Sequence, residues 1–297
     1  MPKLTFKERF KGPRDPNRRP RRAAYALPTL FTAGNVFLGF LALLRTVQGV
    51  MYAVTEKGAH GPNHFFETAA IAIGFAVALD GLDGRIARMT NTVSDFGREL
   101  DSLADVITFG IAPAVLAYSW GIQFLPTDPN NLLHRVGYFV SFLYLLCGAA
   151  RLARFNVQTN PIPKNPGRPD RKYFIGLPIP PAAGIVAAIV YATDTVPLQW
   201  WVWSALWLTL LAIISFLMIS TWRYPSFKDV NLVRPRSPLI FIFLAAVIFL
   251  ICIFPQPTLL TMAVSYVFTG ILIRAGGVIR RRFRHHPPPP HPEHQVG

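Results

Sequence analysis

The chain has 297 residues, of which 52% are hydrophobic and only 15% are charged, and its formal net charge is +15. A soluble domain of this length would carry about 25% charged residues, so the composition excludes an ordinary soluble protein. The basic residues lie mostly outside the apolar runs, which is typical of a polytopic membrane protein with basic flanks and not of a nucleic-acid-binding protein.

A basic segment, residues 1–24, precedes eight apolar runs. A bilayer core about 30 Å thick is crossed by roughly 20 apolar helical residues. With loose boundaries, the runs are 27–51, 66–86, 99–121, 134–153, 175–194, 198–220, 237–254 and 257–276. We therefore expect an all-α fold, a polytopic integral membrane helical bundle of about eight transmembrane helices. The last 18 residues, 280–297, form a His/Pro-rich tail that we expect to be disordered.

The distribution of lysine and arginine predicts the orientation, because these residues accumulate on the cytoplasmic side of membranes. With eight spans, 27 of the 30 lysines and arginines fall on one side. They lie in residues 1–22, 85–98, 151–172, 223–236 and 274–284. Both termini are therefore expected in the cytoplasm, with the protein in the cytoplasmic (inner) membrane.

An acidic stretch joins the second and third runs. Asp80 and Asp83 are three residues apart, and Asp101 and Asp105 are four apart, so each pair shares one face of a helix. The segment "MTNTVSDFG" between them is rich in turn-forming residues. The pattern predicts a helical hairpin whose two carboxylate pairs face each other at the cytoplasmic end of the second and third spans.

Four carboxylates at close range repel one another, and desolvation near a membrane increases the cost. Hard divalent ions take carboxylate oxygens, and two ions about 3.5–4 Å apart would suit four aspartates and hold a transferring phosphoryl group. Small residues nearby, such as Gly81 and Gly84, leave room for a bulky ligand, and Arg88 is placed to hold a phosphate. The alternative is a polar cytoplasmic loop with helix caps, which does not explain helix-face spacing on both sides.

The stretch "DGLDGRIARMTNTVSDFGRELDSLAD" resembles the CDP-alcohol phosphotransferase family at every defined position of its signature D-x-x-D-G-x-x-A-R-x(8)-G-x-x-x-D-x-x-x-D. The matching residues are Asp80, Asp83, Gly84, Ala87, Arg88, Gly97, Asp101 and Asp105. The resemblance implies a six-helix membrane core, usually dimeric, with a dimetal site for Mg²⁺ or Mn²⁺ at the cytoplasmic face. We assign that core to residues 25–220 and two additional helices to residues 221–279.

The resemblance also implies roles for individual residues. Asp80, Asp83 and Asp101 are metal ligands, and Asp105 is a metal ligand and the general base. Gly84 and Arg88 contact the CDP moiety, as does Ser94, which stands six residues after the arginine. Asp80 belongs to the CDP site as well as to the metal site. Asp95 and Glu99 lie outside the signature, and we expect solvated or capping residues there.

Three further stretches resemble the bacterial-type phosphatidylserine synthase branch of the family. They are "LPTLFTAGNVFLGFLALL" (27–44), "RLARFNV" (151–157) and "FIGLPIPPAAG" (174–184). The branch implies transfer of a phosphatidyl group from CDP-diacylglycerol to L-serine with release of CMP, in one metal-assisted displacement. Another acceptor, glycerol 3-phosphate or an inositol phosphate, stays open because the 151–172 segment is basic. A divalent-cation transporter is disfavoured, since transporter sites lie at the membrane midplane.

Within these stretches, three polar residues are candidates for substrate binding, and each has an alternative structural role. Asn35 is a lone amide in a span, to be satisfied either by the nucleotide or by a neighbouring helix. Arg151 and Arg154 are three residues apart at a cytoplasmic helix end, where they either receive a phosphate or the serine carboxylate or serve only as positive anchors. The prolines of "GLPIPP" should delay the start of the fifth span, because proline lacks a donor.

Overall fold

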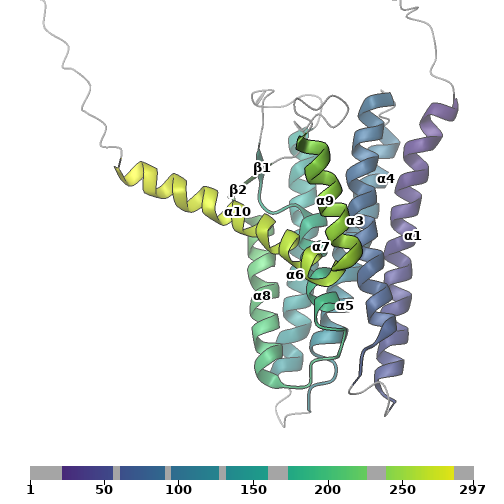
Figure 1. The fold of residues 1–297 in the computed structure, drawn as a ribbon, viewed down its shortest axis with the longest axis vertical. Coiled ribbons are helices and arrows are strands. Elements are labelled where there is room, and N and C mark those ends of the chain that lie inside the picture. Colours follow the sequence, from purple (N-terminus) through teal and green to yellow (C-terminus); the bar gives the residue numbers. More distant parts are fainter. Residues whose placement is uncertain are drawn as a thin grey trace, which may run out of the picture.

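The computed structural model describes residues 22–55, 61–90, 95–126, 132–159, 173–225 and 239–283. Long helices run side by side along the long axis of the molecule (Figure 1). In chain order the elements are α1 (Arg22–Ala53), α3 (His64–Thr90), α4 (Asp95–Asp105), the π-helix η1 (Val106–Ile111), α5 (Ala112–Gly121), α6 (Leu132–Thr159), β1 (Tyr173–Ile175), α7 (Ile179–Ala192), α8 (Trp201–Ile219), β2 (Arg223–Pro225), α9 (Leu239–Ile253) and α10 (Pro255–Phe283).

Each of the eight predicted runs falls on a helix, so the expected all-α membrane bundle is confirmed. Six of the described helical segments are long and apolar enough to cross a bilayer. The other two runs correspond to α7 and α9, which have 14 and 15 residues. At 1.5 Å per residue, these two helices are only about 21–23 Å long.

The core of the bundle lies between α3, α5, α6, α7 and α8. Helix α3 packs between α1 and α7, and α6 packs along α8. Many buried side chains at these contacts are small, including Ala69, Ala76, Ala182 and Ala183. Small residues allow close approach of helices within a membrane, where van der Waals packing drives their association.

The fifth apolar run begins with extended backbone rather than helix, as its prolines predicted. Pro178 has β-region dihedral angles and caps α7, which starts at Ile179. Before it, β1 pairs antiparallel with β2, with Phe174 opposite Tyr224. This two-stranded ribbon of three residues each was not predicted.

Gly176 joins the ribbon to α7 in a conformation that other residues rarely adopt. Its φ is +77°, and a Cβ there would lie 2.5 Å from the carbonyl oxygen of Met218. Its amide donates a hydrogen bond of 2.8 Å to the carbonyl of Trp222. The ribbon is thereby fixed against the carboxyl end of α8.

We expect Gly176→Ala to destabilise the protein by about 1–3 kcal/mol, because alanine meets both an unfavourable φ and a carbonyl oxygen. Thermal unfolding of the purified protein in detergent measures the effect as a lower Tm. Gly74→Ala is the matched control, since a Cβ on Gly74, in the middle of α3, has no neighbour within 4 Å. Equal Tm values for the two variants would contradict this account of Gly176.

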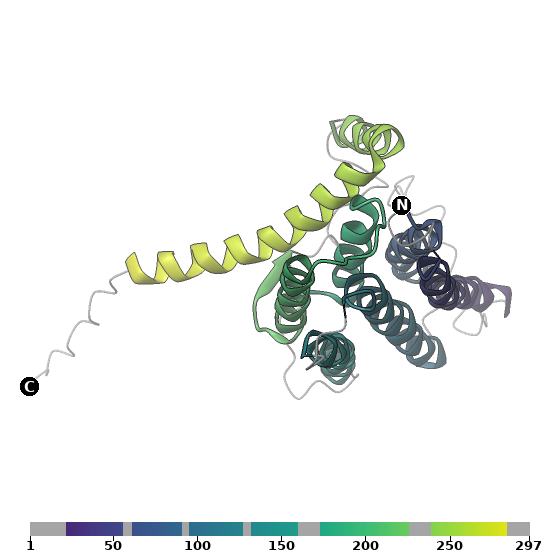
Figure 2. The same cartoon turned by 90° about the horizontal axis from the view of Figure 1, so that it is seen from below.

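Helix α10 leaves the direction of the other helices. It starts beside α9 and α7 and then runs outward across the bundle (Figures 1 and 2). It contacts α7, α9 and β2. Its course was not expected from its apolar run, 257–276, which reads like any other span.

Candidate active site

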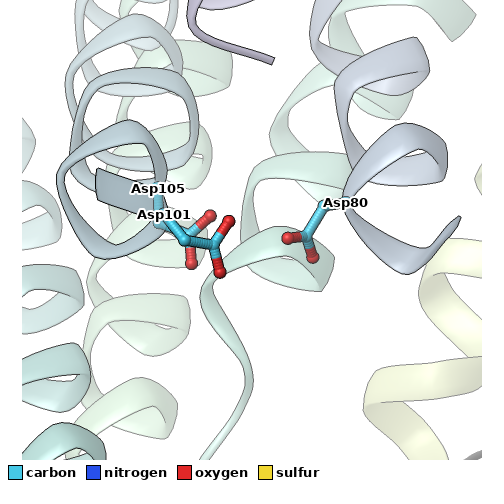
Figure 3. A group of neighbouring side chains, drawn as sticks. All are labelled: Asp80, Asp101 and Asp105. Carbon is cyan, nitrogen blue, oxygen red and sulfur yellow. The ribbon is translucent and has the colours of Figure 1, made fainter. Parts of the chain in front are cut away.

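Three aspartates from two helices meet in the half of the bundle where α3 ends and α4 begins. Asp80 projects from α3 toward Asp101 and Asp105 on α4 (Figure 3). One carboxylate oxygen from each of the three residues lies within 4.8 Å of the others. The predicted convergence of the two halves of the acidic stretch is therefore present for these three residues.

Local helix geometry places Asp101 and Asp105 together, since residues four apart share a face. Asp105 is the last residue of α4 and is 9% exposed. The π-helix η1 follows it immediately, and π segments within helices are frequent at functional sites. Two buried side chains tie η1 to its neighbours: Thr108 donates to the carbonyl of Asn35 at 3.0 Å, and Tyr144 donates to the carbonyl of Phe109 at 3.1 Å.

The electrostatics of the cluster favour a cation. Three ionised carboxylates this close repel one another, and a buried member such as Asp105 also loses hydration. Arg151 of α6, which is 7% exposed, interacts electrostatically with Asp105. Carboxylate oxygens are the ligands that Mg²⁺ and Mn²⁺ prefer, and three of them converge in this cluster. The donor set therefore fits a hard divalent ion.

The sequence model of the CDP-alcohol phosphatidyltransferase family matches residues 25–211. The chain belongs to the CDP-alcohol phosphatidyltransferase family. The match contains the whole aspartate cluster and most of α1 and α8, and it ends before β2, α9 and α10.

Curated relatives fall within the serine branch of this family. The chain is 38% identical over 229 residues to a CDP-diacylglycerol--serine O-phosphatidyltransferase of Helicobacter pylori, covering 77% of this chain and 84% of the relative. It is 32% identical over 206 residues to the protein of the same name from Bacillus subtilis, covering 68% and 91%. An archaetidylserine synthase of Methanothermobacter thermautotrophicus is 35% identical over 203 residues, covering 67% and 70%.

Other residues of the family signature lie near the aspartate cluster in the sequence, but the structure does not describe their side chains. Asp83, Gly84 and Arg88 belong to the last turns of α3, and their side chains lie outside the described part of the structure. Ser94 falls in the gap 91–94, also outside it. The roles of these residues stay predictions.

Asn35 lies on α1 beside η1 and is buried, with 2% exposure. Its backbone carbonyl accepts the bond from Thr108, while its side-chain Oδ1 has no hydrogen-bond partner among the described residues. A buried amide oxygen without a partner is costly, so this position favours an added ligand donor over a helix contact made through Oδ1.

Arg151 and Arg154 occupy different environments although they are one turn apart. Arg154 donates from Nη1 to the carbonyl of Ile219 at 3.0 Å and from Nη2 to the carbonyl of Ile175 at 3.4 Å, which connects α6 to α8 and β1. The Nε of Arg151 is buried and has no hydrogen-bond partner among the described residues. Of the two guanidinium groups, that of Arg151 is better placed to receive a ligand anion.

Two supporting residues were missed by sequence reasoning. Asn156 of α6 donates from Nδ2 to Ser102 Oγ at 2.8 Å, and Ser102 Oγ donates in turn to the carbonyl of Arg98 at 3.0 Å. These bonds attach the carboxyl end of α6 to the helix that carries Asp101 and Asp105. Asn156 lies in "RLARFNV", but the stretch alone gave no sign that its amide faces α4.

An apolar cavity of about 680 Å³ lies between α3, α7, α9 and α10. Its lining includes Val77 and Ala78, which immediately precede the turn of α3 that carries Asp80. Tyr266 of α10 also lines it. The apolar cavity and the aspartate cluster thus involve successive turns of α3.

Proposed function

We propose that the chain transfers the phosphatidyl group of CDP-diacylglycerol to the hydroxyl of L-serine, giving phosphatidylserine and CMP. The aspartate cluster carries the proposal, because it joins the family signature to a donor set suited to divalent ions. The relatives named for serine transfer, at 32–38% identity, support serine as the acceptor.

The surroundings of the cluster support a lipid-linked donor. A substrate with a charged diphosphate and two acyl chains needs polar and apolar surfaces side by side. Asp80 lies three residues after Val77 and two after Ala78, both of which line the cavity. The diphosphate is therefore proposed to lie over the aspartates while an acyl chain extends along this apolar space.

Two Mg²⁺ or Mn²⁺ ions are the proposed cofactors, held by Asp80, Asp83, Asp101 and Asp105. When bound, such ions would neutralise the diphosphate and stabilise the phosphate of departing CMP. Gly84, Arg88 and Ser94 are proposed to contact the CDP moiety, and the side chain of Asn35 is proposed to hydrogen-bond to it. Arg151 is proposed to bind the acceptor or a phosphate group. Arg154 is proposed mainly to connect α6 to α8 and β1.

The proposed reaction is a single in-line displacement. Asp105 accepts the proton of the serine hydroxyl as its oxygen attacks the phosphorus that is bonded to diacylglycerol. The new P–O bond forms as the bond from that phosphorus to the oxygen of CMP breaks. Positioning and electrostatic stabilisation supply most of the rate enhancement, as is general for phosphoryl transfer.

The proposed setting is the cytoplasmic membrane, with both termini and the aspartates on the cytoplasmic side. The predicted spans and the uneven distribution of lysine and arginine support this orientation. A homodimer is proposed from the family resemblance. The basic segment 1–24 is proposed to lie near anionic headgroups of membrane lipids.

A panel of acceptors tests the proposed function. The purified protein, in mixed micelles with CDP-diacylglycerol and Mg²⁺ or Mn²⁺, is expected to release CMP at least tenfold faster with L-serine than without an acceptor. Glycerol 3-phosphate, inositol phosphate and inositol are the comparison acceptors. If CMP were released faster with one of these than with L-serine, that compound and not serine would be the acceptor, while the proposed transfer of the phosphatidyl group would stand.

A further inference from the structure

The guanidinium of Arg151 is a buried cation that interacts electrostatically with Asp105 and still has a donor available for a further anion. Arg151 is only 7% exposed, and its Nε has no hydrogen-bond partner among the described residues. Leaving a buried donor unpaired costs about 1–3 kcal/mol, and more when the group is charged. Arginine binds a carboxylate through two parallel N–H bonds, so a carboxylate in this place would satisfy Nε and one Nη together.

Tyr266 brings α10 to this cation. It is half-buried, lines the apolar cavity and interacts electrostatically with Arg151. Arg151 in turn interacts electrostatically with Asp105, so the same buried arginine is influenced by both Tyr266 and the aspartate cluster. Tyr266 belongs to a helix beyond the family match, which ends at residue 211.

The position of Tyr266 is fixed by Tyr224 of β2. The two rings are stacked with centroids 5.9 Å apart. One turn further along α10, the backbone at Gly270 lies against the Tyr224 ring, because a Cβ on Gly270 would overlap that ring. Tyr224 is fully buried, and its hydroxyl has no hydrogen-bond partner among the described residues.

Tyr266 therefore stacks on Tyr224 and interacts electrostatically with Arg151, two residues that each have a buried polar atom with no partner in the described part of the chain. Arginine pairs with a carboxylate through two parallel N–H bonds, so one carboxylate suits the guanidinium of Arg151. Arg154 is engaged with the carbonyls of Ile219 and Ile175. An amino acid with one free carboxylate and a hydroxyl suits this environment, because the carboxylate would pair with Arg151 while the hydroxyl would be directed to Asp105.

We propose that Tyr266 is a positioning residue for the acceptor, and that α10, held by Tyr224 and Gly270, completes the acceptor side of the site by directing Arg151 toward the acceptor carboxylate. The inference rests on the proposed function. It deepens that function by assigning acceptor specificity to a helix outside the family domain.

Tyr266→Phe tests the inference, because phenylalanine retains the ring that stacks on Tyr224 and lacks the hydroxyl. CMP release by the full-length protein is measured in mixed micelles against L-serine at saturating CDP-diacylglycerol, and then against CDP-diacylglycerol at saturating L-serine. The KM for serine is expected to rise about tenfold, because the hydroxyl that interacts electrostatically with Arg151 is lost. The KM for CDP-diacylglycerol and kcat are expected to change less than twofold.

Tyr138→Phe is the matched control. Tyr138 lies on α6, 62% exposed and about 20 Å along the helix from Arg151 at 1.5 Å per residue. It is expected to leave both KM values unchanged. Gly270→Ala, which displaces α10 from the Tyr224 ring, is expected to raise the serine KM in the same direction as Tyr266→Phe, and thermal unfolding of each variant reports its folding.

A second readout separates positioning from a general loss of packing. Serinol has the hydroxyl and amine of serine but no carboxylate. With each acceptor below its KM, Tyr266→Phe should therefore reduce the rate with serine while leaving the low rate with serinol unchanged. An unchanged serine KM in Tyr266→Phe, or a raised KM for CDP-diacylglycerol instead, overturns the inference and leaves the proposed function standing. Absence of serine-dependent CMP release in the unmodified protein is the distinct result that overturns the proposed function itself.

Discussion

Asp105→Asn is expected to reduce kcat by about 10³-fold while leaving the fold intact, within the 10²–10⁴-fold range of general acid–base catalysis. Asparagine has nearly the shape of aspartate but accepts no proton and brings no charge to the cluster. The largest effect is expected at Asp105, because it is the most buried of the three clustered aspartates and lies at the junction of α4 and η1. Initial rates of CMP release with serine and CDP-diacylglycerol measure the effect.

Glu99→Gln is the matched control for Asp105→Asn. Glu99 is an exposed carboxylate on the same helix α4, and it lies outside the family signature. Its replacement removes one negative charge from the same region and is expected to change the rate less than twofold. If Asp105→Asn retained more than a tenth of the activity of the unmodified protein, Asp105 would not be the general base.

Removal of divalent ions is expected to lower the rate of CMP release at least 100-fold, with recovery on adding Mg²⁺ or Mn²⁺. The reason is the same cluster: three carboxylate oxygens within 4.8 Å repel one another and cannot hold an anionic diphosphate without added positive charge. The rate is measured in EDTA and after adding back each ion in excess. Full activity in EDTA would contradict a metal-dependent site.

Thermal unfolding gives a control that does not depend on turnover. A ligand that binds only the folded protein raises its stability. Mn²⁺ should therefore raise the Tm of the unmodified protein and have a smaller effect on Asp101→Asn, in which one proposed ligand is lost. An equal rise in both proteins would place the stabilising ion elsewhere.

Local patterns predicted the parts of the fold that depend on neighbouring residues. Hydrophobic runs located the helices, and the four-residue spacing of Asp101 and Asp105 predicted their shared face. The prolines of "GLPIPP" predicted the late start of α7, which begins at Ile179. In each case the deciding interaction lies within a few residues of the chain, so the sequence carries it directly.

Features that depend on distant residues were not predictable in the same way. Helix α10 packs on the ribbon where Gly270 meets Tyr224, two residues in separate elements. The attachment of α6 to α4 depends on Asn156 reaching Ser102 across 54 residues of sequence. The family signature located the aspartates but gave no indication of Tyr266, because this residue lies beyond the matched region.

The most direct test of the account is the location of the divalent ion itself. In crystals of the protein grown with Mn²⁺ and CDP-diacylglycerol, anomalous scattering is predicted to show manganese within coordination distance of Asp80, Asp101 and Asp105, against the diphosphate. The contradictory result is a well-ordered structure in which these three carboxylates stand apart and no anomalous peak lies among them.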